Sequence, residues 1–322
     1  MAIADPQTVR VEDPLWKRLL AYSNQRFPIL EHGIMITAYV FSNLFVAQAL
    51  QPEIETTAVG IPLLMGIAVI FLFFLHLRVF DEHKDFENDV EHYSDRVLQR
   101  GVITLTHLKV VGAAAIAGQF ILCMVHSTGA AVAWLLAFGY SLIMLKEFFC
   151  REWLEKRFLL YAITHLLIMP LLALIIYGLA TTNLPWEAPG WFYLYAVLSF
   201  FVMFNWEISR KIRAPEDEVD GIQTYTKVFG TYGAAWVLIG LRVFDVALAA
   251  AIGAVIGVGW GYYAALVVVF FVILAGNIQY LRGPTTERAE RMETYAGLYI
   301  VAFHAIVAIS VALAVGIEIA LW

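Results

Sequence analysis

The chain has 322 residues, of which 61% are hydrophobic and 15% are charged, and its formal net charge is −6. Soluble domains usually contain roughly 45–50% apolar and about 25% charged residues. A water-soluble surface cannot be built from this composition, so the sequence predicts an integral membrane protein. The polar N-terminus lacks the basic-then-apolar layout of a secretory signal. The two cysteines lie far apart and form neither a metal-binding nor a redox spacing.

The N-terminal segment differs in composition from the rest of the chain. We expect residues 1–28 to form a segment of their own and residues 29–322 to form a single transmembrane domain. Within the first segment, residues 13–27 alternate basic and apolar faces. This pattern is typical of a helix that lies flat on a membrane surface, and equally of a simple exposed helix.

Nine apolar runs follow, and each approaches the ~20 residues that a membrane-spanning helix needs. Pro, Gly and polar clusters separate them. The sequence therefore predicts an all-α bundle of nine transmembrane helices. The runs cover residues 29–50, 59–80, 105–126, 129–149, 158–182, 191–209, 230–255, 260–281 and 292–320.

The distribution of Lys and Arg predicts how such a bundle is oriented. Nine spans place the N-terminus and every second loop on one side of the membrane. All Lys and Arg except Arg242, which lies inside the seventh run, fall on that side or at its helix ends. An excess of basic residues marks the cytoplasmic side. We therefore expect the N-terminus and the charged loops to be cytoplasmic, with the C-terminus on the opposite side.

The second apolar run ends in an unusually acidic stretch, VFDEHKDFENDVEH. If the helix continues at ~100° per residue, Asp81, Glu82, Asp85 and Asp89 share one face. Like charges on neighbouring turns destabilise a helix and raise the proton affinity of the carboxylates. A bound cation would relieve this repulsion, and carboxylates suit Mg²⁺ or Ca²⁺. A solvated charged loop that orients the protein is the alternative interpretation.

A second charged stretch, NWEISRKIRAPEDEVDG, follows the sixth run on the same side of the membrane. Its candidate metal ligands are Glu216, Asp217 and Asp220, with Glu207 as a further contributor. Two acidic clusters with interleaved bases suggest a diphosphate held by metal ions between them. The candidate basic partners of the diphosphate are Arg96, Arg100, Lys146, Arg210 and Lys211.

The first acidic stretch resembles a motif of the UbiA superfamily of intramembrane prenyltransferases, N-D-x-x-D-x-x-x-D. From Asp81 to Asp89 the sequence reads DEHKDFEND, with Asp81 for the leading Asn and Glu82 for the first Asp. The hexapeptide RVLQRG, which begins at Arg96, is similar to the downstream element R-P-L-x-x-G, with valine for proline.

The second stretch resembles the family's D-x-x-x-D motif, which is followed by Gly and then Ser or Thr. Gly221 and Thr224 match that ending. Alignment on Gly221 places Asp217 at the second acid, whereas Glu216 and Asp220 satisfy the spacing in a shifted frame. Both frames stay open.

The resemblance implies a nine-helix catalytic domain around a central cavity, with Mg²⁺ as its cofactor. It implies ionisation of a polyprenyl diphosphate donor and transfer of the prenyl group to an apolar or aromatic acceptor, with membrane lipids and no nucleic acid as further partners. The first acidic cluster would hold one metal ion and the second cluster the other, with Asp85 central to catalysis.

Three alternative functions differ in the residues that they require. A UbiA-type terpene cyclase would ionise the same donor and use no acceptor. A divalent-cation transporter would need acids near the bilayer midplane, where the sequence offers Asp245, close to Arg242. A CDP-alcohol phosphotransferase would carry a D-G-x-x-A-R element, which this sequence lacks.

Overall fold

The computed structural model describes residues 4–320. Within this part of the chain, nine helical segments are long and apolar enough to cross a membrane, which confirms the predicted all-α membrane bundle. The segments are α2 (Ile29–Ala49), α3 (Ile61–Lys84), α5 (Leu105–His126), α6 (Thr128–Leu145), the pair α8 (Phe158–Leu166) and α9 (Ile168–Thr181), α10 (Gly190–Ser209), α12 (Thr231–Ile256), α13 (Trp260–Arg282) and α14 (Thr286–Val315).

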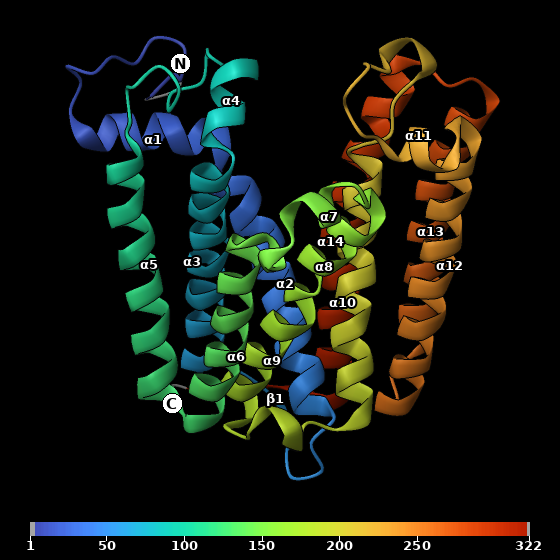
Figure 1. The fold of residues 1–322 in the computed structure, drawn as a ribbon. Helices are drawn as coiled ribbons and strands as arrows, with labels where there is room; N and C mark the ends of the chain where they lie inside the picture. The colour runs from blue at the N-terminus through green and yellow to red at the C-terminus, as the bar shows by residue number, and fades with distance from the viewer. Residues whose placement is uncertain (1–3, 321–322) are drawn as a thin grey trace.

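Shorter elements lie at the two ends of the bundle (Figure 1). At the end that holds the N-terminus, α1 runs across the helix axes, and α4 and α11 stand nearby. A two-stranded parallel sheet of β1 and β2 lies at the opposite end. Their bounds are α1 (Leu15–Arg26), α4 (Phe86–His92), α7 (Arg151–Glu155), α11 (Tyr225–Phe229), β1 (Thr57–Gly60) and β2 (Ile317–Ala320).

The nine spans form a closed ring. Each span packs against the next one along the chain, and α14 packs against α2 to complete the circuit. Further contacts cross the ring, between α2 and α9 and between α10 and α14. These crossing helices bury a large apolar cluster, and an open cavity lies beside it towards one end of the bundle.

The fifth span is broken between α8 and α9. Leu167 separates the two helices, and Pro170 is the third residue of α9. Proline has no N–H to donate to the carbonyl of Leu166, and its ring crowds that carbonyl. The break turns residues of both helices, among them Tyr161 and Met169, towards the cavity.

Three predicted spans have ends that differ from the structure by more than two residues. The second span extends past residue 80 to Lys84, so the start of the acidic stretch is helical. The fourth span ends at Leu145 instead of residue 149, because a turn of left-handed backbone follows. The ninth begins at Thr286, where the Thr285 side chain caps the helix, and ends at Val315, beyond which the chain forms β2.

The start of α6 lies unusually close to the end of α9. A Cβ atom on Gly129 would lie 2.0 Å from the backbone oxygen of Asn183, and one on Gly178 would lie 2.6 Å from the backbone nitrogen of Ala130. Backbone atoms cannot move aside as a flexible side chain can. Small residues are therefore required where these two helices meet.

We predict that Gly129→Ala lowers the stability of the bundle by about 1–3 kcal/mol, because overpacking displaces backbone. Gly139→Ala, in the same helix but with nothing within 4 Å of the added Cβ, is the matched control and should not destabilise the bundle. Thermal unfolding in detergent micelles measures both. Equal midpoints for the two variants would contradict the close approach of α6 and α9.

Candidate active site

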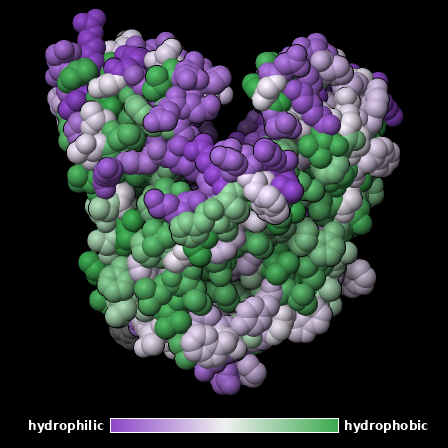
Figure 2. Space-filling view, in the orientation of Figure 1, coloured by the Kyte–Doolittle hydropathy of each residue, from purple (hydrophilic) through white to green (hydrophobic). Residues whose placement is uncertain are grey.

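A cavity of about 640 Å³ opens at the N-terminal end of the bundle. Figure 2 shows its mouth as a hydrophilic hollow between two raised parts of the molecule, above a broad hydrophobic band. The floor and lower walls are apolar, with side chains such as Phe74, Leu77, Met144, Ile168 and Met203. The cavity therefore joins a charged mouth to an apolar interior.

Charged side chains from three regions of the chain meet at this mouth. They come from the end of α1, the segment that runs from α3 through α4 to Arg96, and the end of α10. The bases that line the cavity are Arg26, Arg78, Lys84, Arg96, Arg210 and Lys211. The acids that line it are Asp81, Asp85, Asp89 and Glu207.

The structure separates the four acids of the first predicted cluster. Glu82 does not line the cavity: its side chain is 1% exposed and lies 2.7 Å from Arg26 Nε and 2.9 Å from Arg78 Nη2. Asp89 lines the cavity and accepts a 2.7 Å hydrogen bond from Arg96. Both carboxylates are therefore already neutralised by arginines.

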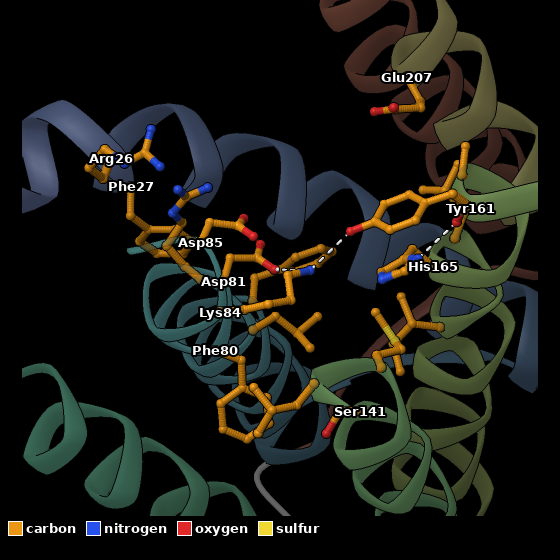
Figure 3. Close-up of a pocket in the computed structure, with 18 of the residues that line it drawn as sticks. Arg26, Phe27, Phe80, Asp81, Lys84, Asp85, Ser141, Tyr161, His165 and Glu207 are labelled. Atoms are coloured by element: carbon orange, nitrogen blue, oxygen red, sulfur yellow. Dashed lines mark hydrogen bonds and ion pairs between the residues drawn. The ribbon is translucent and has the colours of Figure 1, made fainter. Parts of the chain in front are cut away.

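Asp81 and Asp85 are the two acids of this cluster that remain open to the cavity. Figure 3 shows both projecting from the end of α3 towards the wall that carries Tyr161 and His165. Asp81 lies 3.4 Å from Lys84 Nζ. Cationic partners lie beside Asp81, Glu82 and Asp89, but residues 4–320 supply no ion pair or hydrogen bond to the half-buried carboxylate of Asp85.

The electrostatics of Asp85 follow from this position. Burial raises the pKa of the Asp85 carboxyl, and the nearby Asp81 and Asp89 carboxylates add to the increase, while Lys84 opposes it. Each like charge disfavours a further negative charge in the same place. A cation bound beside Asp81 and Asp85 would offset the repulsion between these carboxylates, which is one of the two causes of the raised pKa.

Local backbone structure explains why the acidic face divides. Asp85 caps α3 with φ −99° and ψ 2°, and α4 begins at the next residue. The chain therefore turns at Asp85, and Glu87 and Glu91 point to solvent. A straight helix would place four carboxylates on one face, whereas in the structure arginines pair with Glu82 and Asp89 and leave Asp81 and Asp85 without an arginine partner.

The second predicted acidic cluster does not reach the cavity. Glu216 and Asp220 are exposed, and Asp217 is half-buried in the loop after α10. Pro215 begins a short 3₁₀ turn there, which carries these acids away from the helix end. The cavity is lined instead by residues near the end of α10, namely Glu207, Arg210 and Lys211.

Two of the predicted basic partners also lie outside the cavity. Arg100 donates 2.8 and 2.9 Å hydrogen bonds to the carbonyls of Pro6 and Val9, so it fastens the N-terminal segment. Lys146 is exposed to solvent just beyond α6. Arg96, Arg210 and Lys211 do line the cavity. Burial lowers the pKa of Lys211, with the Glu207 carboxylate opposing the change.

The N-terminal segment belongs to the site. Arg26, the last residue of α1, lines the cavity and lies 3.6 Å from Asp89 as well as 2.7 Å from Glu82. Phe27 also lines the mouth. Side chains on both sides of the predicted boundary at residue 28 thus line the same cavity.

A buried network on the opposite wall was not predicted, because no sequence pattern indicates it. Glu147 is 4% exposed and lies 2.8 Å from Lys84 Nζ, accepts a 3.0 Å hydrogen bond from Tyr161, and lies 3.3 Å from His165 Nε2. Residues 147–149 all have positive φ, at 47°, 54° and 58°. Left-handed backbone costs non-glycine residues roughly 1–2 kcal/mol each, so the network holds this turn in place.

The intramembrane pair that a transporter would use is fully buried and outside the cavity. Asp245 accepts a 2.7 Å hydrogen bond from Asn205 and a 3.4 Å bond from Tyr299. Arg242 donates a 2.6 Å hydrogen bond to Asn277. These hydrogen bonds join α10, α12, α13 and α14, and neither Arg242 nor Asp245 lines the cavity.

No family model matches the sequence, and no curated protein sequence is significantly similar to it. Solved structures do match the fold along most of the chain. A UbiA homologue from Aeropyrum pernix K1 matches with a TM-score of 0.64 and 15% identity over 87% of this chain and 98% of the other. A digeranylgeranylglyceryl phosphate synthase matches with a TM-score of 0.61 and 15% identity over 92% of this chain and 99% of the other.

A UbiA homologue from Archaeoglobus fulgidus, solved with DMAPP and Mg²⁺ bound, matches with a TM-score of 0.53 and 14% identity. That match covers 89% of this chain and 99% of the other. The protein therefore has the fold of UbiA homologues along nearly its whole length, as the sequence motifs predicted.

We predict that Glu147→Gln destabilises the protein at pH 7. Burial raises the pKa of Glu147, but bonds from His165 and Lys84 outweigh it and lower the pKa from 4.5 to about 2. A carboxyl whose pKa is lower in the folded state than in the unfolded state stabilises the fold at pH values above the unfolded-state pKa, and this stabilisation is lost as the pH falls through the folded-state pKa. The free energy of unfolding of the wild type should exceed that of the variant by on the order of 2–3 kcal/mol above pH ~4.5, and the difference should shrink towards pH ~2.

Chemical unfolding in detergent micelles at pH 7 and pH 3 measures this difference. Glu155→Gln, which removes an exposed ion pair with Arg151, is the matched control and should change stability by less than about 1 kcal/mol. A deficit of Glu147→Gln that stays constant with pH would show that the carboxylate charge is not what stabilises the turn.

Proposed function

We propose that this chain, which has the UbiA fold, is a Mg²⁺-dependent intramembrane prenyltransferase. It would ionise a polyprenyl diphosphate and transfer the prenyl group to an apolar or aromatic acceptor. The observation that carries the proposal is the unpaired Asp85 carboxylate beside Asp81, in a cavity whose mouth is rich in Arg and Lys and whose interior is apolar. An amphipathic ligand fits such a cavity, with its anionic head at the basic mouth and its apolar tail in the interior.

The donor set at Asp81 and Asp85 fits Mg²⁺. This ion commonly binds one or two carboxylates and shares its other positions with water and substrate phosphates. Asp85 is half-buried and unpaired within residues 4–320, and burial together with neighbouring negative charge raises its pKa. When bound, Mg²⁺ neutralises charge that develops on a leaving diphosphate. The homologue from Archaeoglobus fulgidus was solved with DMAPP or GPP and Mg²⁺, which supports the assignment by analogy of fold.

The side chains of the mouth would bind and orient the diphosphate. Arg96 and Arg210 offer planar guanidinium groups that can each donate two hydrogen bonds to phosphate oxygens. Lys84 and Lys211 add point charges from opposite walls. Preorganised positive groups of this kind stabilise negative charge where it accumulates, because they need no rearrangement during the reaction.

The apolar interior would hold the prenyl chain. The bond that breaks joins the first prenyl carbon to the diphosphate oxygen, and its electron pair leaves with the diphosphate. Aromatic faces at Phe80 and Trp206 line the path of the resulting allylic cation and can stabilise it. Exclusion of water by the surrounding helices protects the cation until a nucleophilic atom of the acceptor attacks it and loses a proton.

The same proposal fixes the orientation in the membrane. The cavity mouth lies at the end of the bundle that carries nearly all the Lys and Arg, so the donor head would enter from the cytoplasmic side. Residues beyond α14 would then lie on the opposite side.

We predict that Asp85→Asn reduces diphosphate release by at least about 100-fold, since it removes the unpaired charge beside the bound cation. The assay follows release from a panel of prenyl diphosphates with Mg²⁺ and purified protein. Asp217→Asn makes the same chemical change outside the cavity and should retain wild-type release. Full activity of Asp85→Asn, with an unchanged unfolding midpoint, would refute the assigned site.

Removal of divalent ions is expected to stop the reaction without unfolding the protein. Chelation with EDTA should abolish diphosphate release, and added Mg²⁺ should restore it, while the thermal unfolding midpoint in EDTA stays within a few degrees of the original. Release that continues in excess EDTA would contradict a metal-dependent mechanism.

A further inference from the structure

The α10 wall of the cavity offers a carboxylate whose two oxygens are both occupied. Glu207 Oε2 lies 2.7 Å from Arg210 Nε, and Glu207 Oε1 lies 2.6 Å from Lys211 Nζ. A metal ion at Glu207 would have to displace both cations. Its own charge would also be repelled by them at these short distances.

No second acid from the same region supplements Glu207. Among the described residues after α10, Glu216, Asp217 and Asp220 do not line the cavity. The Glu218 carboxylate accepts hydrogen bonds from Thr224 and Thr226, which bind it within its own loop. The donor set expected for a second metal ion is therefore missing from this wall.

Arg210 and Lys211 are held where a phosphate group could reach them. Both line the cavity, and Glu207 fixes their side chains from below. The Arg210 guanidinium lies 5.1 Å from the ring centre of Trp206, and Lys211 Nζ lies 5.0 Å from the ring centre of Phe158. Aromatic faces attract cations but donate no competing charge, so both groups keep the capacity to bind an anion.

We propose that the site binds one divalent cation, at Asp81 and Asp85, and that Arg210 and Lys211 contact the diphosphate directly where a second cation was expected. Glu207 is then a positioning residue for the two bases and not a metal ligand. This inference rests on the proposed function, because it concerns the same diphosphate. The sequence predicted one metal ion at each of two acidic clusters. The proposed site instead has a divalent cation on one wall of the cavity and the side chains of Arg210 and Lys211 on the other.

The inference is tested by counting bound metal. Mn²⁺ replaces Mg²⁺, inorganic diphosphate serves as the probe, and electron paramagnetic resonance measures free and bound Mn²⁺ during titration of the full chain. We expect one Mn²⁺ per chain at saturating diphosphate. Two Mn²⁺ per chain would overturn the inference but leave the proposed function intact. If neither Mn²⁺ nor diphosphate binds, the proposed function fails with it.

Variants separate the two walls. Lys211→Gln should weaken diphosphate binding at least about tenfold at saturating Mn²⁺ while the Mn²⁺ count stays at one. Asp81→Asn should instead weaken Mn²⁺ binding. Lys156→Gln replaces lysine with glutamine at an exposed position outside this cavity, so it is the matched control for Lys211→Gln.

Thermal unfolding confirms that each variant is folded. A Lys211→Gln variant that is folded but binds diphosphate as tightly as the control would overturn the direct contact. A Glu207→Gln variant that loses one bound Mn²⁺ would overturn the role of Glu207 as a positioning residue.

Discussion

The Asp85 carboxylate is half-buried at the rim of an apolar cavity, and residues 4–320 give it no cationic partner. A buried charge must be paired, bound to a metal or neutralised by a proton, because water no longer solvates it fully. The other acids near the mouth satisfy this constraint with Arg26, Arg78 and Arg96. Asp85 and its neighbour Asp81 therefore still need a cation, and this need determines what the site can bind.

The fold creates this need for a cation because it brings distant segments of the chain together at the cavity mouth. The helix α3 continues past the apolar run, so it carries Asp81 to the mouth, and the turn at Asp85 aims the next carboxylate inward. The break before Pro170 tilts Tyr161 and His165 towards the same space. On that wall, Glu147 holds Lys84 through a buried contact of 2.8 Å. Among the acids that line the cavity, Asp85 alone therefore has no cationic partner within residues 4–320.

The sequence predicted the architecture well because each step depended on local composition. Apolar runs predicted all nine spans, six of them to within one residue at each end, and the motif around Asp81 and Asp85 lies at a helix end that lines the cavity. Spacing alone could not show that Glu82 turns towards Arg26, since that contact joins residues 56 positions apart in the chain. Nor could it show that Pro215 diverts the acids after α10 into an outer loop. The Glu147 network was missed because three successive non-glycine residues with positive φ have no sequence signature.

The most direct test locates the cation itself. Crystals grown with Mn²⁺ and inorganic diphosphate would give an anomalous diffraction signal at each bound metal ion. The account predicts a signal between the carboxylates of Asp81 and Asp85, with diphosphate density extending towards Arg210 and Lys211. A Mn²⁺ signal in the loop of Glu216 and Asp220, with none at Asp85, would contradict it.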